Sequence, residues 1–87
     1  MSERREAFRA ALPALVASLD SGSGVRLQQI YEAIEVQLPQ FVDDEPDAHH
    51  PRELRWRHEL RWEIEGLVIA GAIARRKDIG RAIYACS

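Results

Sequence analysis

The apolar residues of this chain recur at the three- and four-residue spacing of an amphipathic helix in three separate segments. In the first segment, Pro13 interrupts the pattern. Proline is unfavourable inside a helix but welcome in its first turn. We therefore expect a short helix over residues 3–11 and a second one from Pro13 to Leu19. The apolar stripe consists of Phe8, Leu12, Leu15, Val16 and Leu19.

The second and third segments are more regular. One helix is expected over residues 27–38, with Pro39 as its stop. Another is expected from residue 51 or 52 to about residue 70, where Gly71 ends it. The predicted core positions are Leu27, Ile30, Tyr31, Ile34 and Leu38 on the former, and Trp56, Leu60, Ile64, Leu67 and Val68 on the latter.

The segments between these helices carry turn and loop signals. DSGSG, residues 20–24, predicts a turn, and Val25-Arg26 behind it is a very short extended piece. Residues 40–51, QFVDDEPDAHHP, predict a polar loop that Phe41 and Val42 attach to the core. A loop of this length without periodicity is unusual in a small domain and indicates a functional or mobile segment.

After Gly71 the periodicity changes from helix to strand. AIARR and RAIYAC are short β-prone runs on either side of KDIG, whose Gly80 can supply the positive φ of a hairpin turn. The predicted fold class is therefore mainly α with a small β-hairpin. Three helices followed by a hairpin are the elements of a winged helix, a three-helix bundle plus a C-terminal two-stranded wing.

Length and composition fit one small domain, which we place at residues 1–87. The chain has 87 residues, of which 46% are apolar. The longest apolar run, residues 66–73, is too short to span a bilayer, and the charged N-terminus does not resemble a signal peptide. The lone Cys86 excludes an internal disulfide. We expect a cytoplasmic protein without membrane association.

The net charge of −2 conceals a division along the chain. Residues 1–51 hold four basic and nine acidic side chains, a net charge of −5, whereas residues 52–87 hold eight basic and five acidic ones, a net charge of +3. Eleven of the twelve basic residues are arginine, which suits planar recognition of phosphate or guanine, although a GC-rich coding sequence would give the same bias. A segregated basic half favours a polyanionic partner.

Two stretches carry a family resemblance. ALPALVASLDSGSG has a proline that starts a helix ending in a glycine-containing turn, and RWEIEGLVIAGAIARRKDIGRAIY combines Trp62, Leu67 and the Ala70-Gly71 pair with a hairpin that holds Gly80 and Tyr84. They resemble the opening and the close of the N-terminal domain of Mrr-type restriction endonucleases. The resemblance covers most of the chain.

This resemblance implies a winged helix that stands ahead of a nuclease or other effector domain, in systems that attack foreign or modified DNA. We therefore expect an N-terminal reader module of a longer protein, with double-stranded DNA, modified or not, as its partner. The acidic stretch 43–47 and three glutamates among the arginines of the third helix predict only modest affinity for a random duplex. These glutamates are Glu59, Glu63 and Glu65.

Eight residues are candidates for DNA contact. Four lie off the apolar face of the third helix, where arginine can bind guanine O6 and N7 together: Arg52, Arg55, His58 and Arg61. The alternative for these is a solvated face with Arg55–Glu59 and Arg61–Glu65 ion pairs. Four more bracket the hairpin turn and would contact phosphates, or else protect an exposed edge by charge: Arg75, Arg76, Lys77 and Arg81.

Trp62 and Ile69 lie almost opposite the core face of the third helix. We expect them to be buried beneath the hairpin. The alternative is an exposed patch that stacks on a flipped base or meets a partner subunit in a homodimer.

We expect no cofactor, no metal site and no catalytic site. His49, His50, His58, Cys86 and Asp47 lack the paired spacing of zinc ligands, and no nucleophile or phosphate-loop motif occurs. The favoured function is a non-catalytic reader of double-stranded DNA, with the third helix in the major groove and the wing on the backbone. The alternative is a winged-helix module for protein interaction or dimerisation.

Overall fold

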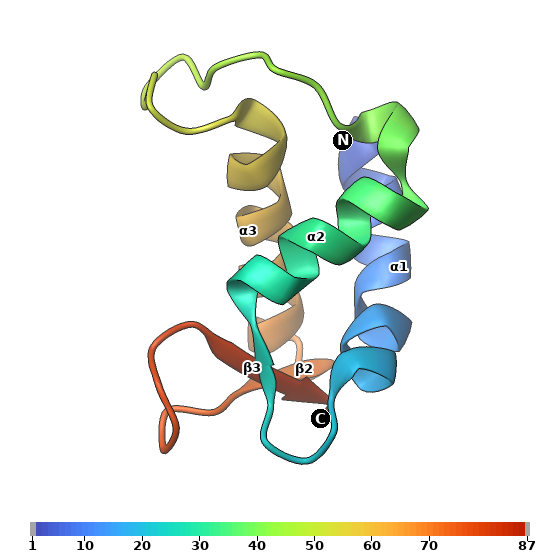
Figure 1. Ribbon diagram of the computed structural model, residues 1–87, viewed down its shortest axis with the longest axis vertical. Helices are drawn as coiled ribbons and strands as arrows, with labels where there is room; N and C mark the ends of the chain where they lie inside the picture. The colour runs from blue at the N-terminus through green and yellow to red at the C-terminus, as the bar shows by residue number, and fades with distance from the viewer. Residues whose placement is uncertain (1, 87) are drawn as a thin grey trace.

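The computed structural model describes residues 2–86, in which three helices pack side by side and a small antiparallel sheet closes one end of the bundle (Figure 1). The elements, in chain order, are α1 (Glu3–Leu19), β1 (Val25–Arg26), α2 (Leu27–Gln37), a single 3-10 turn (Pro39–Phe41), α3 (Arg55–Ile69), β2 (Ile73–Arg75) and β3 (Ile83–Cys86). The predicted class, mainly α with a small β portion, is confirmed. None of the helices in residues 2–86 combines the length and the apolar character needed to cross a membrane.

Helix α1 is continuous, so the predicted division at Pro13 is wrong. Ser2 is the N-cap of the helix, and its Oγ accepts a hydrogen bond of 3.1 Å from the amide of Arg5. Buried residues lie on both sides of Pro13 and face one core: Phe8, Leu12, Leu15 and Val16. Their burial offsets the hydrogen bond that proline cannot donate, because packing outweighs local propensity in a short helix.

The apolar stripe of α2 occupies the predicted register. Ile30, Tyr31 and Ile34 are buried, while Leu27 and Leu38 at its two ends are partly buried against the core. On α3 the predicted apolar stripe is likewise buried in its first part and partly buried at its end. Trp56, Leu60 and Ile64 are buried, and Leu67 and Val68 are partly buried.

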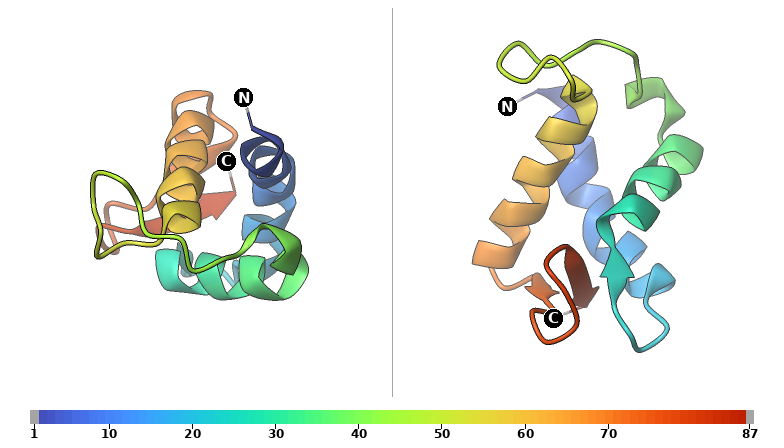
Figure 2. Two further views of the ribbon diagram at one scale, coloured as in Figure 1. Left: turned by 90° about the horizontal axis from the view of Figure 1, so that it is seen from above. Right: turned by 60° about the vertical axis from the view of Figure 1, so that its left-hand side comes forward.

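Helix α3 starts at Arg55, later than predicted, because the chain before it folds back on itself. Residues 42–54, the connecting loop, arch from the end of α2 to the start of α3 (Figure 2). Pro46 and Leu54 form an isolated antiparallel bridge, and the amide of Arg55 donates to the carbonyl of Glu45 at 2.9 Å. Partners from the loop thus satisfy a backbone donor at the first turn of α3, in place of an earlier helical turn.

Gly71 ends α3 as predicted, with a φ of 83°. The amide of Ala72 donates to the carbonyl of Leu67 at 2.9 Å, and the amide of Gly71 donates to the carbonyl of Val68 at 3.1 Å. These two bonds form the Schellman motif, which turns the chain sharply toward β2.

The sheet contains a third strand in addition to the predicted hairpin. Its order is β1-β3-β2, and both neighbours of β3 run antiparallel to it. Val25 pairs with Tyr84, while Ile73 pairs with Cys86. A Cβ on Gly24 would lie 2.4 Å from Cγ2 of Ile83, so only glycine allows the chain to pass β3 this closely.

The hairpin (residues 73–86) turns through residues 76–82. The amides of Ile79 and Gly80 both donate to the carbonyl of Arg76, at 3.0 and 3.1 Å. This helix-like turn needs no positive φ at Gly80, and the prediction of one is wrong: the glycines with positive φ in residues 2–86 are Gly22, Gly24 and Gly71.

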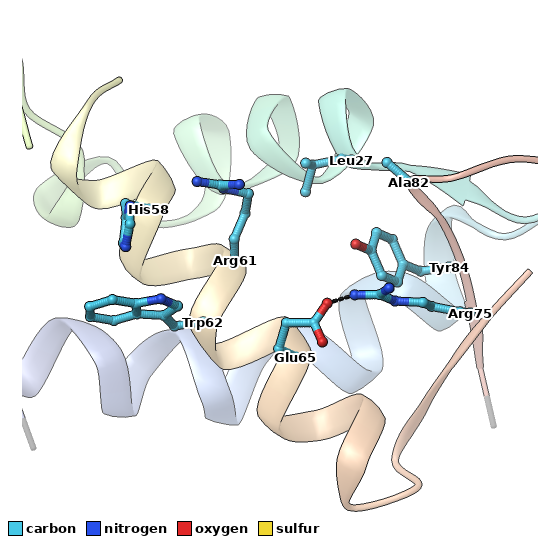
Figure 3. A pocket seen from close by; sticks show the side chains of 8 residues that line it. All are labelled: Leu27, His58, Arg61, Trp62, Glu65, Arg75, Ala82 and Tyr84. Atoms are coloured by element: carbon cyan, nitrogen blue, oxygen red, sulfur yellow. Dashed lines mark ion pairs between the residues drawn. The ribbon is translucent and has the colours of Figure 1, made fainter. Parts of the chain in front are cut away.

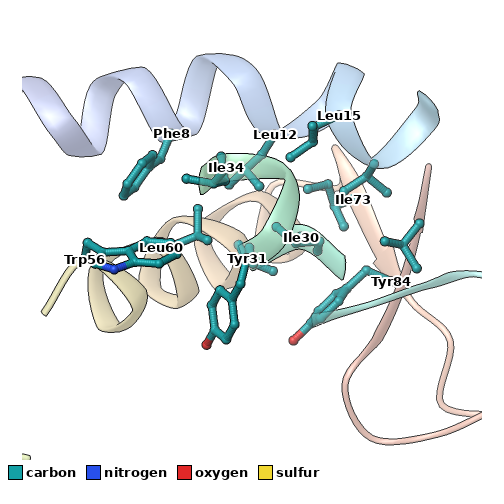
Figure 4. Packing of buried hydrophobic residues seen from close by; sticks show 13 residues of the cluster. Phe8, Leu12, Leu15, Ile30, Tyr31, Ile34, Trp56, Leu60, Ile73 and Tyr84 are labelled. Carbon is teal, nitrogen blue, oxygen red and sulfur yellow. The ribbon is translucent and has the colours of Figure 1, made fainter. Parts of the chain in front are cut away.

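One core joins all three helices to the sheet (Figure 4). Tyr31 and Trp56 meet edge to face at 5.7 Å between ring centroids, and Phe8 meets Phe41 in the same manner at 6.3 Å. Phe41 and Val42 pack against the core as predicted, which attaches the start of the connecting loop to the bundle.

Candidate nucleic-acid interface

Two glutamates of α3 point toward α1 and away from the outer face of α3, the face that holds Arg55 and Arg61. Glu63 is fully buried, and its two oxygens accept hydrogen bonds from Nε of Arg5 at 2.7 Å and from Nε of Arg9 at 2.8 Å. The Glu59 carboxylate accepts hydrogen bonds from Nε and from a terminal nitrogen of Arg4, both at 3.0 Å. Neither glutamate therefore contributes unpaired negative charge to the outer face, although the sequence places both among its arginines.

Burial raises the pKa of Glu59, but the hydrogen bonds and positive charges of Arg4 and Arg55 outweigh burial and hold that pKa below its ordinary value. Arg55 donates to Glu59 across one helical turn at 3.2 Å, so this predicted ion pair is confirmed. The pair ties the first turn of α3 to the contact between α1 and α3.

The connecting loop supplies acidic partners to the outer face of α3. Glu45 lies 3.4 Å from Arg55, and both side chains are about half exposed. Glu53 pairs with Arg61. The predicted Arg61–Glu65 pair is wrong, because Glu65 instead pairs with Arg75 of the hairpin. The arginines that point outward from α3 are thus already beside carboxylates.

His58 lies under the connecting loop, with only 12% of its side chain exposed. Its ring stacks on His50 at 5.7 Å and meets Trp62 edge to face at 4.3 Å. Its Nδ1 lies 3.2 Å from a carboxylate oxygen of Glu53. Of the predicted contact residues on α3, His58 is therefore the least accessible.

Asp47 fixes the shape of the connecting loop beside His58. Its Oδ2 accepts from the amides of His49 and His50, both at 2.9 Å. Burial raises the pKa of Asp47, yet these hydrogen bonds and the nearby histidines leave that pKa below its ordinary value. The loop is thus held by its own backbone and side chains.

Within the part of the chain that the structure describes, the hairpin carries both paired and unpaired cations. Arg76 donates to both oxygens of Asp78, at 3.1 and 2.9 Å, and this hydrogen-bonded pair lowers the pKa of Asp78. Lys77 and Arg81 have no ion-pair partner among residues 2–86. Together with Arg75 and Gly80 they line a hollow of about 360 Å³. Arg52, in the connecting loop and not on α3 as predicted, also lacks an ion pair within these residues.

The prediction that Trp62 and Ile69 are buried beneath the hairpin is wrong. Trp62 is 53% exposed and Ile69 is 84% exposed. The hairpin lies at the end of the helical bundle, where Ile73 and Tyr84 enter the core, so it does not cover this side of α3 (Figures 1 and 4). Trp62 is flanked by His58 and by the Arg5 guanidinium, 5.3 Å from its ring centroid.

A pocket of about 380 Å³ lies between α3 and the hairpin (Figure 3). It is lined by Leu27, His58, Arg61, Trp62, Glu65, Arg75, Ala82 and Tyr84. Sequence reasoning missed this pocket because its walls come from three separate elements. It also missed the α1–α3 ion pairs, although Arg5 and Arg9 have the same four-residue spacing as Glu59 and Glu63.

No group of three or more histidine, cysteine, aspartate or glutamate side chains within residues 2–86 is arranged to hold a metal ion. Cys86 is exposed and unpaired. Comparisons of the chain with protein-family models, curated proteins and solved structures give no match in any of the three. The resemblance to the Mrr-type N-terminal domain therefore stays a prediction.

Proposed function

We propose that this chain is a non-catalytic winged-helix domain that binds double-stranded DNA, with the hairpin as the wing on the phosphate backbone and α3 at the major groove. The element order supports the fold: three helices, with the last followed by a hairpin whose strands share a sheet with a short strand before α2. The observation that carries the functional proposal is the pair of unneutralised cations, Lys77 and Arg81, on the hollowed hairpin.

The arrangement of α3 is consistent with this role. With Glu59 and Glu63 turned toward α1, the outer face holds Arg55 and Arg61. Their pairs with the connecting loop are at least partly exposed, and exposed pairs of this kind are worth about 0–1 kcal/mol. A phosphate or a guanine edge can therefore replace the carboxylates at small cost. The same carboxylates keep affinity for a random duplex modest.

The test removes two positive charges from the hairpin and compares the effect on DNA binding with that of a double variant on another surface. In a Lys77→Gln/Arg81→Gln variant, all duplexes should bind more weakly. The slope of log affinity against log salt should fall by about 0.9 for each phosphate that the variant no longer neutralises. Fluorescence anisotropy with labelled duplexes, unmodified and modified, at two salt concentrations measures both quantities.

The matched control is Ala10→Glu/Ala17→Glu on the exposed face of α1, which changes the net charge by the same amount. This control should leave the salt slope unchanged. Duplex binding that does not depend on salt, or an equal weakening in both double variants, would contradict the proposal.

A second function is favoured by one observation, the exposure of Trp62 and Ile69 on the same side of α3. Exposed apolar residues at helical spacing suit contact with another protein, including a second copy of this chain. Sedimentation velocity of the parent and of a Trp62→Gln/Ile69→Gln variant decides between these functions. A dimer that dissociates in the variant, together with no salt-sensitive DNA binding, would favour the interaction module.

We further propose that the domain is an N-terminal reader module of a longer protein. As a reader module, the domain would deliver DNA to a downstream nuclease or other effector domain. Recognition of a modified base would then depend on α3 and on the pocket beside it.

A further inference from the structure

We propose that the pocket between α3 and the hairpin binds a single nucleobase. This inference rests on the proposed function, because the base would come from the duplex that α3 and the hairpin contact. The pocket's volume of about 380 Å³ falls in the range of small-molecule sites, roughly 300–1,000 Å³.

The pocket is preformed by the fold. Tyr84, on the central strand of the sheet, is only 6% exposed, and its hydroxyl points toward Arg61 across the pocket (Figure 3). The amide of Leu27 donates to the carbonyl of Ala82 at 3.0 Å, which joins the α2 side of the pocket to the hairpin. Trp62 stands on the opposite side, with His58 against its ring. Binding would therefore require little reorganisation.

The pocket lining includes residues with polar atoms that lack a hydrogen-bond partner within residues 2–86. Nε of Arg61 is buried and has no hydrogen-bond partner within the described chain. Buried polar atoms without partners are rare in folded proteins, and each calls for an explanation such as a ligand or an ordered water. The Tyr84 hydroxyl likewise makes no hydrogen bond among residues 2–86. Two residues of the lining, Arg61 and Tyr84, thus each carry a donor without a hydrogen-bond partner among residues 2–86.

The lining has the groups that a planar base requires. Among the lining side chains the only carboxylate is that of Glu65, which is paired with Arg75. A nucleobase has acceptors for Arg61 and Tyr84, donors for Glu65, and flat faces that suit the apolar surfaces of Leu27 and Ala82. Mixed donors and acceptors beside apolar side chains match a neutral heterocycle.

The cost of extruding a base predicts that an unpaired base would enter the pocket more readily than a paired one. Extruding a paired base costs a few kcal/mol of stacking and pairing energy, and a bulged or mismatched base avoids most of that cost. A site of this kind therefore prefers a duplex with one unpaired base to a fully matched duplex.

The first test uses the full chain and free nucleosides, and needs no DNA binding. Adenosine, guanosine, cytidine and thymidine at millimolar concentration should shift the backbone amide signals of Leu27, Trp62 and Tyr84 in nitrogen-15 correlation spectra. Ala82→Leu, which fills the pocket, should abolish these shifts. Tyr84→Phe keeps the ring and removes only the hydroxyl, so it should weaken them even if Ala82→Leu fails to fold. Absence of any shift at the pocket with all four nucleosides overturns the proposal.

The second test separates this proposal from the proposed function. A duplex with a single-base bulge should bind at least tenfold more tightly than the matched duplex, and Tyr84→Phe should reduce that ratio. Lys77→Gln/Arg81→Gln should weaken both duplexes equally. Salt-sensitive binding with no preference for the bulge would refute the pocket and leave the DNA-binding proposal standing. Nucleoside shifts without duplex binding would refute the DNA-binding proposal and leave the pocket proposal standing.

Discussion

Replacing both Arg5 and Arg9 with alanine would strip the buried Glu63 carboxylate of its partners. Glu63 has no solvent exposure, whereas the side chains of Arg5 and Arg9 are 32% and 49% exposed. Removing one side of a buried ion pair costs about 3–5 kcal/mol when the remaining charge stays buried. A domain of this size is stable by about 5–15 kcal/mol, so the double variant should lose a large share of its free energy of unfolding.

The structure also predicts an asymmetry between the two sides of this pair. Glu63→Leu leaves two arginines that are partly exposed and can be hydrated, so its cost should be smaller than that of the double variant. Adding Glu63→Leu to the double variant removes the stranded charge and should restore stability, because apolar replacement of a buried ion pair is often neutral or stabilising.

Urea unfolding followed by circular dichroism measures these differences. With a denaturant dependence of about 2 kcal/mol per molar urea, the double variant's midpoint should fall by roughly 1.5–2.5 M. Lys77→Ala/Arg81→Ala removes the same charge from residues without buried partners and should keep the parent's midpoint. A double variant as stable as the parent, or a triple variant no more stable than the double, would refute the assignment of Glu63 as a buried, paired charge.

Three further outcomes follow from the packing and the hydrogen bonds. Asp20 accepts amide hydrogen bonds, and Glu59, although partly buried, pairs with arginines, so both have folded-state pKa values below the ordinary 3.8 and 4.5. Their contribution to stability is complete above the ordinary pKa values and is lost as pH falls through the folded-state pKa values. Thermal scans should therefore show the melting temperature dropping below about pH 4. A melting temperature that stays constant there would contradict this. Gly24→Ala brings a Cβ within 2.4 Å of the hairpin and should lower the melting temperature clearly more than Gly22→Ala, where nothing lies within 4 Å; equal effects would show that the close approach is not needed. Leu60→Ala should cost about 2–5 kcal/mol in urea unfolding, and an unchanged midpoint would mean that the register of α3 is wrong.

The parts of the fold that the sequence predicts are those set by local periodicity. The stripes of α2 and α3 and the stop at Gly71 depend on neighbours a few residues away, which one sequence displays directly. The continuity of α1 through Pro13 depends on burial against other helices. The preference of proline for the first turn of a helix therefore gave the wrong prediction for α1.

The candidate site was less predictable, because its charges are assigned partners by tertiary contacts. The sequence shows Glu63 among arginines of α3, but only the packing of α1 turns it inward toward Arg5. Similarly, the exposure of Trp62 depends on the hairpin closing the end of the bundle and leaving its side uncovered. Helical spacing identifies which residues share a face, but it does not identify what covers that face.

The position of β3 between β1 and β2 has a consequence for the order of folding. Tyr84 pairs with Val25, a partner far away in the sequence, whereas helix formation involves only near neighbours. Closing so long a loop costs entropy before the pairing stabilises it, so we expect the sheet to form after the folding transition state. Substitutions at the β1–β3 contact should then accelerate unfolding and leave the folding rate nearly unchanged. The pocket wall that Tyr84 provides would be among the last parts of the molecule to form.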